Sequence, residues 1–315
     1  MTASGPGPLH EASGPVALGT FEYGTGAVPP AQAALLLRTY HEHGGRLLDT
    51  APTYGPADGE GRAESLIGRW LRDSGAQGME VITKAGLDPA RPERGDLRPE
   101  TILASLARST QRLGVTVTLV LHRDDPAVPV DEIADALDRA VGSGLARRVG
   151  TSNWTTARLA RWIADAARTG RTAPSVTAPL WSIAPRAVPA QEPWLVEADG
   201  AHLRLAARHG LTVTPYRTLA AGFLADRHSG RHAAHHAAAY DTPAGRLRRA
   251  RLRQAAATLG MTSHGLALAC LRAASPTAVP VVGPRTPGQL RECLRGAVAG
   301  PRVRPELLRY LEARP

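Results

Sequence analysis

Eight short runs rich in β-branched and other apolar residues recur along this chain of 315 residues, and helical patterns separate them. Alternating strand and helix units predict a parallel sheet, because a helix provides the crossover that parallel neighbours need. Eight such units close most naturally into a (β/α)8 barrel, so we predict a single α/β barrel domain over residues 15–315, with parallel strands inside an outer ring of helices. The runs are VALGTF (16–21), RLLDT (46–50), VITK (81–84), TLVLH (118–122), RRVGTS (147–152), SVTAP (175–179), TVTPY (212–216) and VPVVG (279–283).

The helical segments between the runs have clear start and stop residues. Prolines open the segments 29–44 and 99–113, while glycines close the segments 29–44, 131–144 and 155–170. The segment 64–72 carries apolar residues at helical spacing. In a barrel of this kind the active-site side chains lie at the carboxyl ends of the strands, so we expect the functional residues at the ends of these runs.

Two segments do not fit this alternation. Residues 1–14 are small, polar and rich in proline and glycine, without the basic start and apolar stretch of a signal peptide, so we predict a flexible tail. Residues 223–245 carry few large apolar side chains and predict a mobile loop beside the site. The loop has no carboxylate or cysteine pattern to support a metal site, so we predict that its histidines are solvated and bind no metal: His228, His232, His235 and His236.

Composition narrows the class of partner. A net charge of +10 suggests nucleic-acid binding, but the arginines are dispersed, and the one dense run, RLRRARLR (246–253), has no aromatic residue to stack on bases. No stretch is long and apolar enough to span a bilayer. Cys270 and Cys293 give neither a disulfide framework nor a zinc spacing. We therefore predict a cytoplasmic protein with a small-molecule substrate and no nucleic-acid or membrane partner; the sequence leaves the oligomeric state open.

One lysine and one asparagine occur in the whole chain, and both follow predicted strands. Of the 38 lysine and arginine residues only Lys84 is a lysine, which suggests pressure toward arginine wherever a general positive charge suffices. A compact ammonium with a tunable pKa is a property that arginine cannot supply. Lys84 ends the third run and Asn153 follows the fifth, beside Ser152. Although a chance surface lysine is the alternative, this position predicts a role in the site.

Other polar residues at neighbouring strand ends complete a proton-transfer set. Asp49 ends the second run, His122 ends the fourth, and Tyr54 follows Asp49 in the loop DTAPTYG. An ammonium close to a phenol favours the phenolate and lowers its pKa from about 10, which brings proton donation into range. Asp49 would compensate the buried ammonium, and His122 would orient a substrate oxygen. Each residue alone could be structural, but together they predict a site that polarises and protonates a carbonyl.

These motifs give the chain a resemblance to the aldo-keto reductases over nearly its whole length. The matching segments, in order, are DTAPTYG, AESLIGRWL, VITKAG, LVLHRDD, RRVGTSNW, TPYRTLAAGFL and VVGPRTPGQL. The resemblance implies that Tyr54 is the general acid, that Lys84 and Asp49 tune it, and that His122 orients the carbonyl. It also implies an NADPH-dependent reductase of aldehydes or ketones, able to oxidise the alcohol in reverse.

The same resemblance implies a cofactor site along the barrel mouth. Hydride would come from nicotinamide C4, the carboxamide would be held beside strand five, the pyrophosphate by the loop after strand seven, and the adenosine end after strand eight. Because a guanidinium suits a 2′-phosphate, NADPH is favoured over NADH. The implied residues are Ser152, Asn153, Trp181, Tyr216, Arg217, Leu219, Gly222, Gly283, Arg285 and Gln289. For the substrate pocket the strand-end loops offer Phe21, Tyr23 and Trp154.

The chain also departs from the family pattern. Ala178 stands where a glutamine usually grips the carboxamide, and Trp181 stands where a tyrosine usually stacks under the nicotinamide. Arg217 replaces a common serine, and Cys293 replaces an asparagine often seen against the adenine. These departures bear on cofactor choice and affinity, and they leave the four catalytic candidates intact.

Three other functions remain open at this stage. A regulatory subunit could use the same fold and bind the cofactor without turnover. An enzyme could use the cofactor transiently, for epimerisation or a specialised biosynthetic step. A nucleic-acid binder would show salt-dependent binding. The four intact catalytic candidates favour the reductase, and specificity lies in loops that one sequence does not decode.

Overall fold

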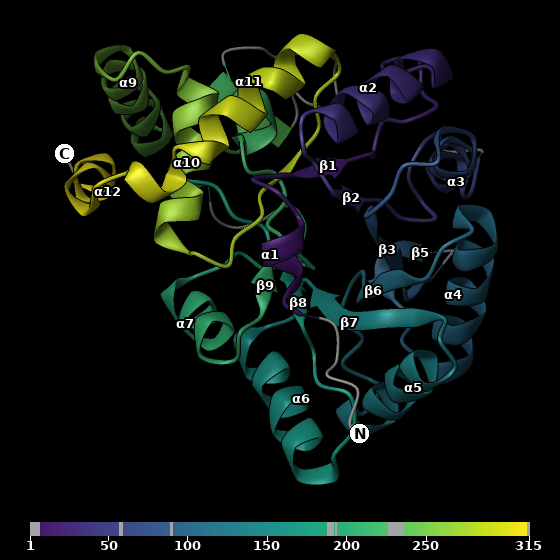
Figure 1. Ribbon diagram of the computed structural model, residues 1–315. Coiled ribbons are helices and arrows are strands. Elements are labelled where there is room, and N and C mark those ends of the chain that lie inside the picture. Colours follow the sequence, from purple (N-terminus) through teal and green to yellow (C-terminus); the bar gives the residue numbers. More distant parts are fainter. Residues whose placement is uncertain are drawn as a thin grey trace.

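Eight parallel strands form the centre of the fold in the computed structural model, which is drawn in Figure 1 and describes residues 7–56, 59–88, 91–187, 192, 194–225 and 236–313. They are β1 (Ala17–Gly19), β2 (Leu47–Asp49), β3 (Glu80–Ala85), β6 (Val117–Leu121), β7 (Ala146–Ser152), β8 (Val176–Ala178), β9 (Thr212–Val213) and β10 (Val281–Val282). Their order in the sheet is β10-β1-β2-β3-β6-β7-β8-β9, and every pair is parallel.

The sheet curls until its two edge strands approach one another. Val213 of β9 bridges Ala278, and the amide of Val279 donates to the carbonyl of Val213 at 2.8 Å. The amide of Val281 in turn donates to the carbonyl of Pro215. These bonds connect β10 and the residues before it to β9 and the residues after it, so the predicted barrel is confirmed as a near-closed parallel barrel surrounded by helices. A separate antiparallel pair, β4 (Leu87–Asp88) and β5 (Arg91–Gly95), follows β3.

Figure 1 shows the strands surrounded by helices. Pro99 begins one helix and Gly114, at φ +71°, ends it, whereas Thr155 caps another by accepting from the amide of Arg158. None of the helices in the described ranges is long and apolar enough to cross a membrane. The helices are α2 (Pro30–Glu42), α3 (Arg62–Ser74), α4 (Pro99–Leu113), α5 (Val130–Gly142), α6 (Thr156–Thr169), α7 (Gly200–Arg208), α9 (Pro243–Thr258), α10 (Ser263–Ala274), α11 (Pro287–Val298) and α12 (Pro305–Glu312).

The interior of the barrel is filled by one side chain or two from each of several strands. This cluster contains Leu9, Ala17, Leu47, Ile82, Val120, Val176, Ala178 and Val279. All of them are buried, and all but Leu9 come from the strands or the residues that lead into them. Small and β-branched residues suit this narrow space, which explains why the strands read as short apolar runs.

Leu9 belongs to a segment for which flexibility was expected, and the structure corrects this. Residues 9–12 form a short helix, α1 (Leu9–Ala12), and Leu9 is 1% exposed. The backbone amide of His10 donates to the hydroxyl of Thr212 at 3.1 Å, and Arg148 donates to the carbonyl of Gly7. The second half of the segment 1–14 is therefore part of the packed domain, because an apolar side chain was available to fill the barrel; residues 1–6 lie outside the described ranges.

The expected mobile loop at 223–245 is also shorter than its sequence suggests. Its first residues, including Phe223 and Leu224, belong to a buried 3-10 segment, η1 (Ala220–Ala225), and α9 begins at Pro243. Residues 226–235 lie outside the described ranges, and so do three of the four histidines named above. His236 is described, and its ring lies 3.4 Å from a guanidinium nitrogen of Arg217.

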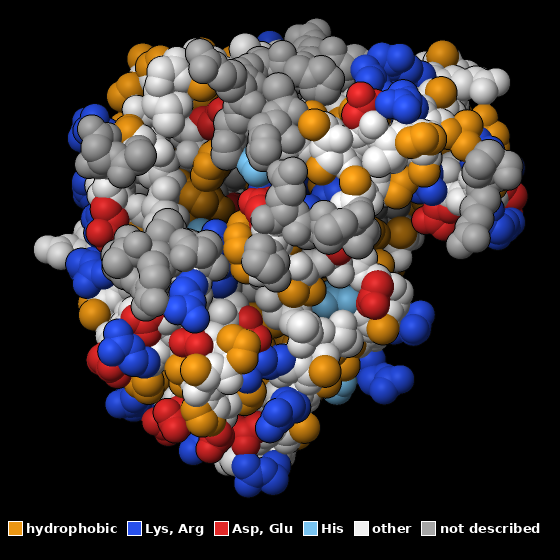
Figure 2. Space-filling view, turned by 180° about the vertical axis from the view of Figure 1, so that it is seen from behind, with side chains coloured by type: hydrophobic (Ala, Val, Ile, Leu, Met, Phe, Trp, Pro, Cys, Tyr) orange, Lys and Arg blue, Asp and Glu red, His pale blue; other side chains and the backbone are white. Residues whose placement is uncertain are grey.

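The dense arginine run at 246–253 lies on α9, where several of its members stabilise tertiary contacts. Arg248 donates to the carbonyl of Ile183 at 2.7 Å, and Arg249 lies 4.8 Å over the ring of Phe223. Basic side chains are scattered among acidic ones on the face seen in Figure 2, without gathering into one stripe. The run therefore holds α9 in place, a role that its sequence alone does not reveal.

Candidate functional site

Lys84 lies at the centre of the polar cluster that forms where β2 and β3 end. Its ammonium nitrogen lies 2.8 and 2.9 Å from the two carboxylate oxygens of Asp49, 3.0 Å from the carbonyl of Thr50 and 3.0 Å from the hydroxyl of Tyr54. Lys84 and Asp49 are 4% and 5% exposed. The structure therefore brings together three of the four catalytic candidates, with the buried ammonium charge compensated by a carboxylate.

Strand register and one tight turn produce this arrangement. Asp49 pairs with Ile82 across the parallel ladder, which puts Lys84 one pleat further along β3 and on the same edge. The amide of Tyr54 donates to the carbonyl of Ala51, and Gly55, at φ +110°, donates to the carbonyl of Phe21. The turn bends the chain back after β2, so the tyrosine ring returns over the end of β3.

His122 follows β6 and faces the tyrosine. Its amide donates to the carbonyl of Ala85 at 2.8 Å, and its ring lies 6.1 Å from the Tyr54 ring at 77°. The ring of Phe21 lies 5.3 Å from Tyr54 at 81°. Phe21 is 51% exposed, so Tyr54 contacts both a histidine and an aromatic side chain that reaches solvent.

The ionisation of these groups follows from burial and from the lysine. Burial, the Lys84 charge and the Arg123 charge hold the pKa of His122 well below its usual range, so the imidazole is neutral. Burial opposes the charge on Lys84, but Asp49 and Tyr54 outweigh it and raise the lysine pKa. Burial raises the pKa of Tyr54 and Lys84 offsets this only in part, so the structure corrects our expectation of a lowered phenol pKa.

Ser152 and Asn153 form a hydrogen-bonded unit at the end of β7. The Asn153 side-chain amide donates to the Ser152 hydroxyl at 3.1 Å and to the carbonyl of His122 at 3.2 Å. Its oxygen accepts from the hydroxyl of Tyr216 at 2.5 Å. Asn153 has φ +60°, a left-handed conformation that asparagine tolerates better than most residues, which explains why it persists in a chain with no other asparagine.

Trp181, expected to stack under the nicotinamide, and Tyr216, expected among the cofactor residues, are backbone neighbours, because the Trp181 amide donates to the Tyr216 carbonyl at 3.3 Å, but their side chains make different contacts. The hydroxyl of Tyr216 touches Asn153, whereas Trp181 packs on an apolar cluster of α6, α7 and β9 that includes Leu159. Ala178 is buried inside the barrel and presents no donor at the mouth. The aromatic ring that the fold brings to Asn153 is therefore Tyr216.

Tyr23 and Trp154, which were expected in the substrate pocket, are core residues instead. Cys293, at the position where the family often has an asparagine against the adenine, is also in the core. Tyr23 and Trp154 are each 1% exposed, and Trp154 packs on Trp162 with ring centres 6.0 Å apart. Cys293 is 5% exposed inside the main core, where burial raises the pKa of its thiol to about 12. Their large or apolar side chains are more stable in the interior than at the mouth, so of the three pocket candidates only Phe21 lies open beside Tyr54.

The residues after β9 and β10 present two arginines. Arg217 donates to both carboxylate oxygens of Glu192 at 2.8 and 3.2 Å. Arg285 donates to both oxygens of Glu22 at 2.6 and 2.5 Å. Neither glutamate was anticipated, because nothing in the sequence around position 22 or 192 points to a partner so distant in the chain.

The loop between these arginines has an uncommon backbone. Ala220, Ala221 and Gly222 have φ values of 52°, 53° and 94°, and Leu219 is half-buried next to them. Consecutive amides in such turns can form a concave site for an anion. Further along, the Arg285 amide donates to the side chain of Gln289 at 2.8 Å, and a Cβ added to Gly283 would meet open space.

A pair that sequence reasoning missed lies next to His122. The guanidinium of Arg123 stacks over the ring of Trp194 at 3.7 Å. Trp194 comes from the loop that follows β8, a segment in which the sequence shows no motif. No group of three or more histidine, cysteine, aspartate and glutamate residues in the described ranges could hold a metal ion.

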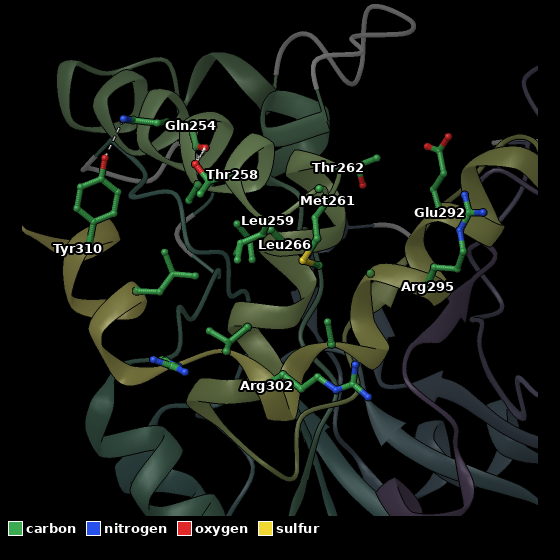
Figure 3. Close-up of a pocket in the computed structure, with 17 residues that line it drawn as sticks. Gln254, Thr258, Leu259, Met261, Thr262, Leu266, Glu292, Arg295, Arg302 and Tyr310 are labelled. Atoms are coloured by element: carbon green, nitrogen blue, oxygen red, sulfur yellow. Dashed lines mark hydrogen bonds between the residues drawn. The ribbon is translucent and has the colours of Figure 1, made fainter.

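A hollow that is separate from the polar cluster around Lys84 is drawn in Figure 3. It encloses about 840 Å³ between α9, α10, α11 and α12, with Leu259, Met261 and Leu266 among its lining residues and Arg302 at its edge. It contains no residue of the cluster around Lys84. The hollow is therefore separate from the polar cluster around Lys84.

The structure is thus an α/β barrel protein with tyrosine, lysine, aspartate and histidine side chains at the carboxyl-terminal ends of its strands. The family model described as "Aldo/keto reductase family" matches residues 15–299. The chain therefore belongs to the aldo/keto reductase family, and membership suggests an oxidoreductase.

Curated relatives share shorter stretches with this chain. A "6-dehydroglucose reductase" of Novosphingobium aromaticivorans is 35% identical over 152 residues, which cover 46% of this chain and 49% of that protein. An "L-glyceraldehyde 3-phosphate reductase" of Escherichia coli strain K12 is 38% identical over 135 residues, covering 41% and 38%. A "Probable voltage-gated potassium channel subunit beta" of Oryza sativa subsp. japonica is 27% identical over 202 residues, covering 63% and 58%. The chain thus spans roughly 40–60% of the length of the curated relatives it matches.

Proposed function

We propose that this protein is an NADPH-dependent reductase of an aldehyde or ketone, reversible toward alcohol oxidation. The observation that carries the proposal is the position of the Lys84 ammonium, which is hydrogen-bonded at once to Tyr54 and to Asp49. A phenol in contact with a compensated ammonium can give up a proton and be stabilised as phenolate in the same place.

Each residue then has a distinct part in the reaction. Tyr54 donates its proton to the carbonyl oxygen, and Lys84 stabilises the phenolate that forms. Neutral His122 donates a hydrogen bond to the same oxygen and fixes its direction. The nicotinamide, when bound, supplies the hydride to the carbonyl carbon, so proton and hydride together convert the carbonyl to an alcohol.

The polar groups at the mouth fit a nicotinamide dinucleotide. Asn153 and Ser152 offer an amide and a hydroxyl that can hold a carboxamide, and the ring of Tyr216 lies beside them. Arg217 and the left-handed backbone at 220–222 supply positive charge and amides suited to a pyrophosphate. Arg285 offers a guanidinium to the adenosine end, which favours a 2′-phosphate and hence NADPH.

The shape of the mouth adds a constraint on the substrate. Phe21 lies beside Tyr54 and is open to solvent, and Trp194 stacks on Arg123, the residue that follows His122. Aromatic walls suit a substrate with an apolar or planar group next to its carbonyl. The names of two relatives include 6-dehydroglucose and L-glyceraldehyde 3-phosphate, so polar carbonyl compounds should also be tested as substrates.

The first experiment is a fluorescence titration of the purified protein with NADPH and NADH, followed by a panel of aldehydes and ketones. Five tryptophans provide the signal. NADPH binding with carbonyl-dependent loss of NADPH absorbance is the expected result. Absence of binding by either cofactor would overturn the proposal and restrict the family inference to the fold.

A second candidate is a regulatory subunit that binds the cofactor without useful turnover. The similarity to a probable channel β subunit, over a larger share of this chain than the two reductases cover, is the observation that favours it. Tight cofactor binding, no turnover on the panel and a stable protein partner would support this candidate. Turnover without net consumption of cofactor would instead indicate an epimerase-like use of transient redox chemistry.

A further inference from the structure

The ends of β9 and β10 have the features of a phosphate site. They are the seventh and eighth strands of the barrel, and in barrel enzymes the loops after these strands, with a helix N-terminus, frequently bind phosphate. Here those loops carry Arg217 and Arg285, and α11 begins two residues after Arg285 with Thr286 as its cap. Each of these two neighbouring strands is therefore followed by an arginine, and the one after β10 immediately precedes a helix N-terminus.

Both guanidiniums are already engaged by carboxylates from other loops. Glu22 comes from the loop after β1 and accepts from two different nitrogens of Arg285 at 2.6 and 2.5 Å. Its side chain is 30% exposed and that of Arg285 is 24% exposed, so the pair is only partly open to solvent. Glu192 engages Arg217 in the same two-oxygen manner, at 2.8 and 3.2 Å.

The backbone around Arg285 is fixed independently of Glu22. Its amide donates to the Gln289 side chain at 2.8 Å, and its carbonyl accepts from the Gln32 side chain at 2.9 Å. The backbone position of Arg285 is therefore defined by contacts other than its ion pair with Glu22. A carboxylate and a phosphate offer the same pair of oxygens to the Arg285 guanidinium, so they compete for it.

We propose that Glu22 is a specificity-determining residue, which competes with the adenosine 2′-phosphate for Arg285 and so reduces the preference for NADPH over NADH. The proposal rests on the reductase function proposed above. A dianionic phosphate must displace the Glu22 carboxylate or lie beside it, and both cost binding energy. A ribose 2′-hydroxyl can instead donate to Glu22 while the ion pair stays intact, as acidic residues do in NAD sites of other folds.

The two glutamates differ in what they should affect, which provides a matched control. Glu192 faces Arg217, next to the left-handed loop suited to the pyrophosphate, and both cofactors contain that group. Loss of the Glu192 charge should therefore change the affinity for NADPH and NADH by the same factor. Loss of the Glu22 charge should change the affinity for NADPH alone.

The test measures dissociation constants of NADPH and NADH by fluorescence titration for the wild type, Glu22→Gln and Glu192→Gln. We expect Glu22→Gln to bind NADPH at least tenfold more tightly and NADH within about twofold of the wild type, whereas Glu192→Gln leaves the ratio unchanged. A change of less than about threefold in the ratio of the NADPH and NADH dissociation constants of Glu22→Gln would overturn the proposal. Weaker NADPH binding by Glu22→Gln would also overturn it, because Glu22 would then position Arg285 for the phosphate.

A second comparison separates this role from a structural one. In an Arg285→Gln background, Glu22→Gln should leave the NADPH to NADH ratio unchanged, because the competition needs the guanidinium. A full shift in that background would mean that Glu22 acts on the cofactor directly or through the fold, and would overturn the proposal. A wild type that binds neither cofactor would overturn the proposed function as well, whereas binding with an unmoved ratio would overturn only the role of Glu22.

Discussion

The Lys84 ammonium donates to the phenol oxygen of Tyr54 at 3.0 Å and, at the same time, to the two carboxylate oxygens of Asp49 at 2.8 and 2.9 Å. Asp49 compensates the buried charge, the carbonyl of Thr50 accepts a further hydrogen bond from the ammonium, and in the proposed reaction the charge stabilises the Tyr54 phenolate. Arginine would bring a larger, planar cation into a space where Lys84 is 4% exposed. The single lysine of the chain is explained by this geometry.

Replacing Lys84 with arginine should preserve the fold and remove most reductase activity. The positive charge remains, but the phenolate loses its close ammonium, and a loss of roughly 10²–10⁴ in kcat is expected. Crowding should cost about 1–3 kcal/mol in the free energy of unfolding. Turnover and urea unfolding of Lys84→Arg check this, with exposed Arg147→Lys as the control. Wild-type turnover in Lys84→Arg would refute the assigned role.

Replacing Tyr54 with phenylalanine should separate chemistry from binding. The ring contacts with Phe21 and His122 remain, and Lys84 keeps its bonds to Asp49. We expect cofactor affinity within about twofold of the wild type and a fall in kcat of roughly 10²–10⁴, because the proton donor is lost. Stopped-flow turnover measures the change; a fall smaller than tenfold would mean that another group donates the proton.

Buried His202 should make stability depend on pH. Burial lowers its pKa, although Asp199 partly opposes this, and the ring lies 2.9 Å from the hydroxyl of Thr177. Because the folded pKa lies below the unfolded value, the unfolded chain binds the proton first as the pH falls. The stabilisation is complete above about pH 6.5 and is lost below it, at up to about 1.4 kcal/mol per pH unit.

Urea unfolding of the wild type between pH 7.5 and 5 should show this loss of stability, and His202→Gln should show a shallower dependence. Exposed His209 offers the control, and His209→Gln should keep the wild-type dependence. His122 has a lowered pKa for related reasons and contributes with the same sign, so some dependence should remain in His202→Gln. Identical slopes in both variants would show that His202 does not control stability in this range.

Replacing Leu9 with alanine should destabilise the fold, because Leu9 fills part of the barrel interior. Leu9 is 1% exposed and packs with Ala17, Leu47 and Val176 inside the barrel, so Leu9→Ala should lower the free energy of unfolding by about 2–5 kcal/mol. Leu259, which is 54% exposed, provides a control, and Leu259→Ala should change stability by less than about 0.5 kcal/mol. Equal effects of the two truncations, measured in urea, would contradict the packing of α1.

The family of the chain and the general place of its site could be predicted from the sequence. Strand and helix periodicity is local, and parallel strands must meet at the same edge, so Asp49, Lys84 and His122 could be placed together by their positions at strand ends. Asn153 could be placed there too, and the structure adds the reason for its identity, a φ of +60°.

The partners of side chains in the loops were decided by the tertiary structure. Trp154 and Tyr23 follow strands as Phe21 does, yet only Phe21 stays at the surface. Arg285 meets Glu22 across 263 residues of sequence, and Leu9 fills a barrel whose opening exists only after eight strands have assembled. Periodicity shows which face of a helix or strand is apolar, whereas contacts between loop side chains depend on where the fold brings distant residues together. The sequence by itself therefore determined the barrel scaffold and the residues at its strand ends. Only tertiary packing decided which loop side chains surround those strand ends.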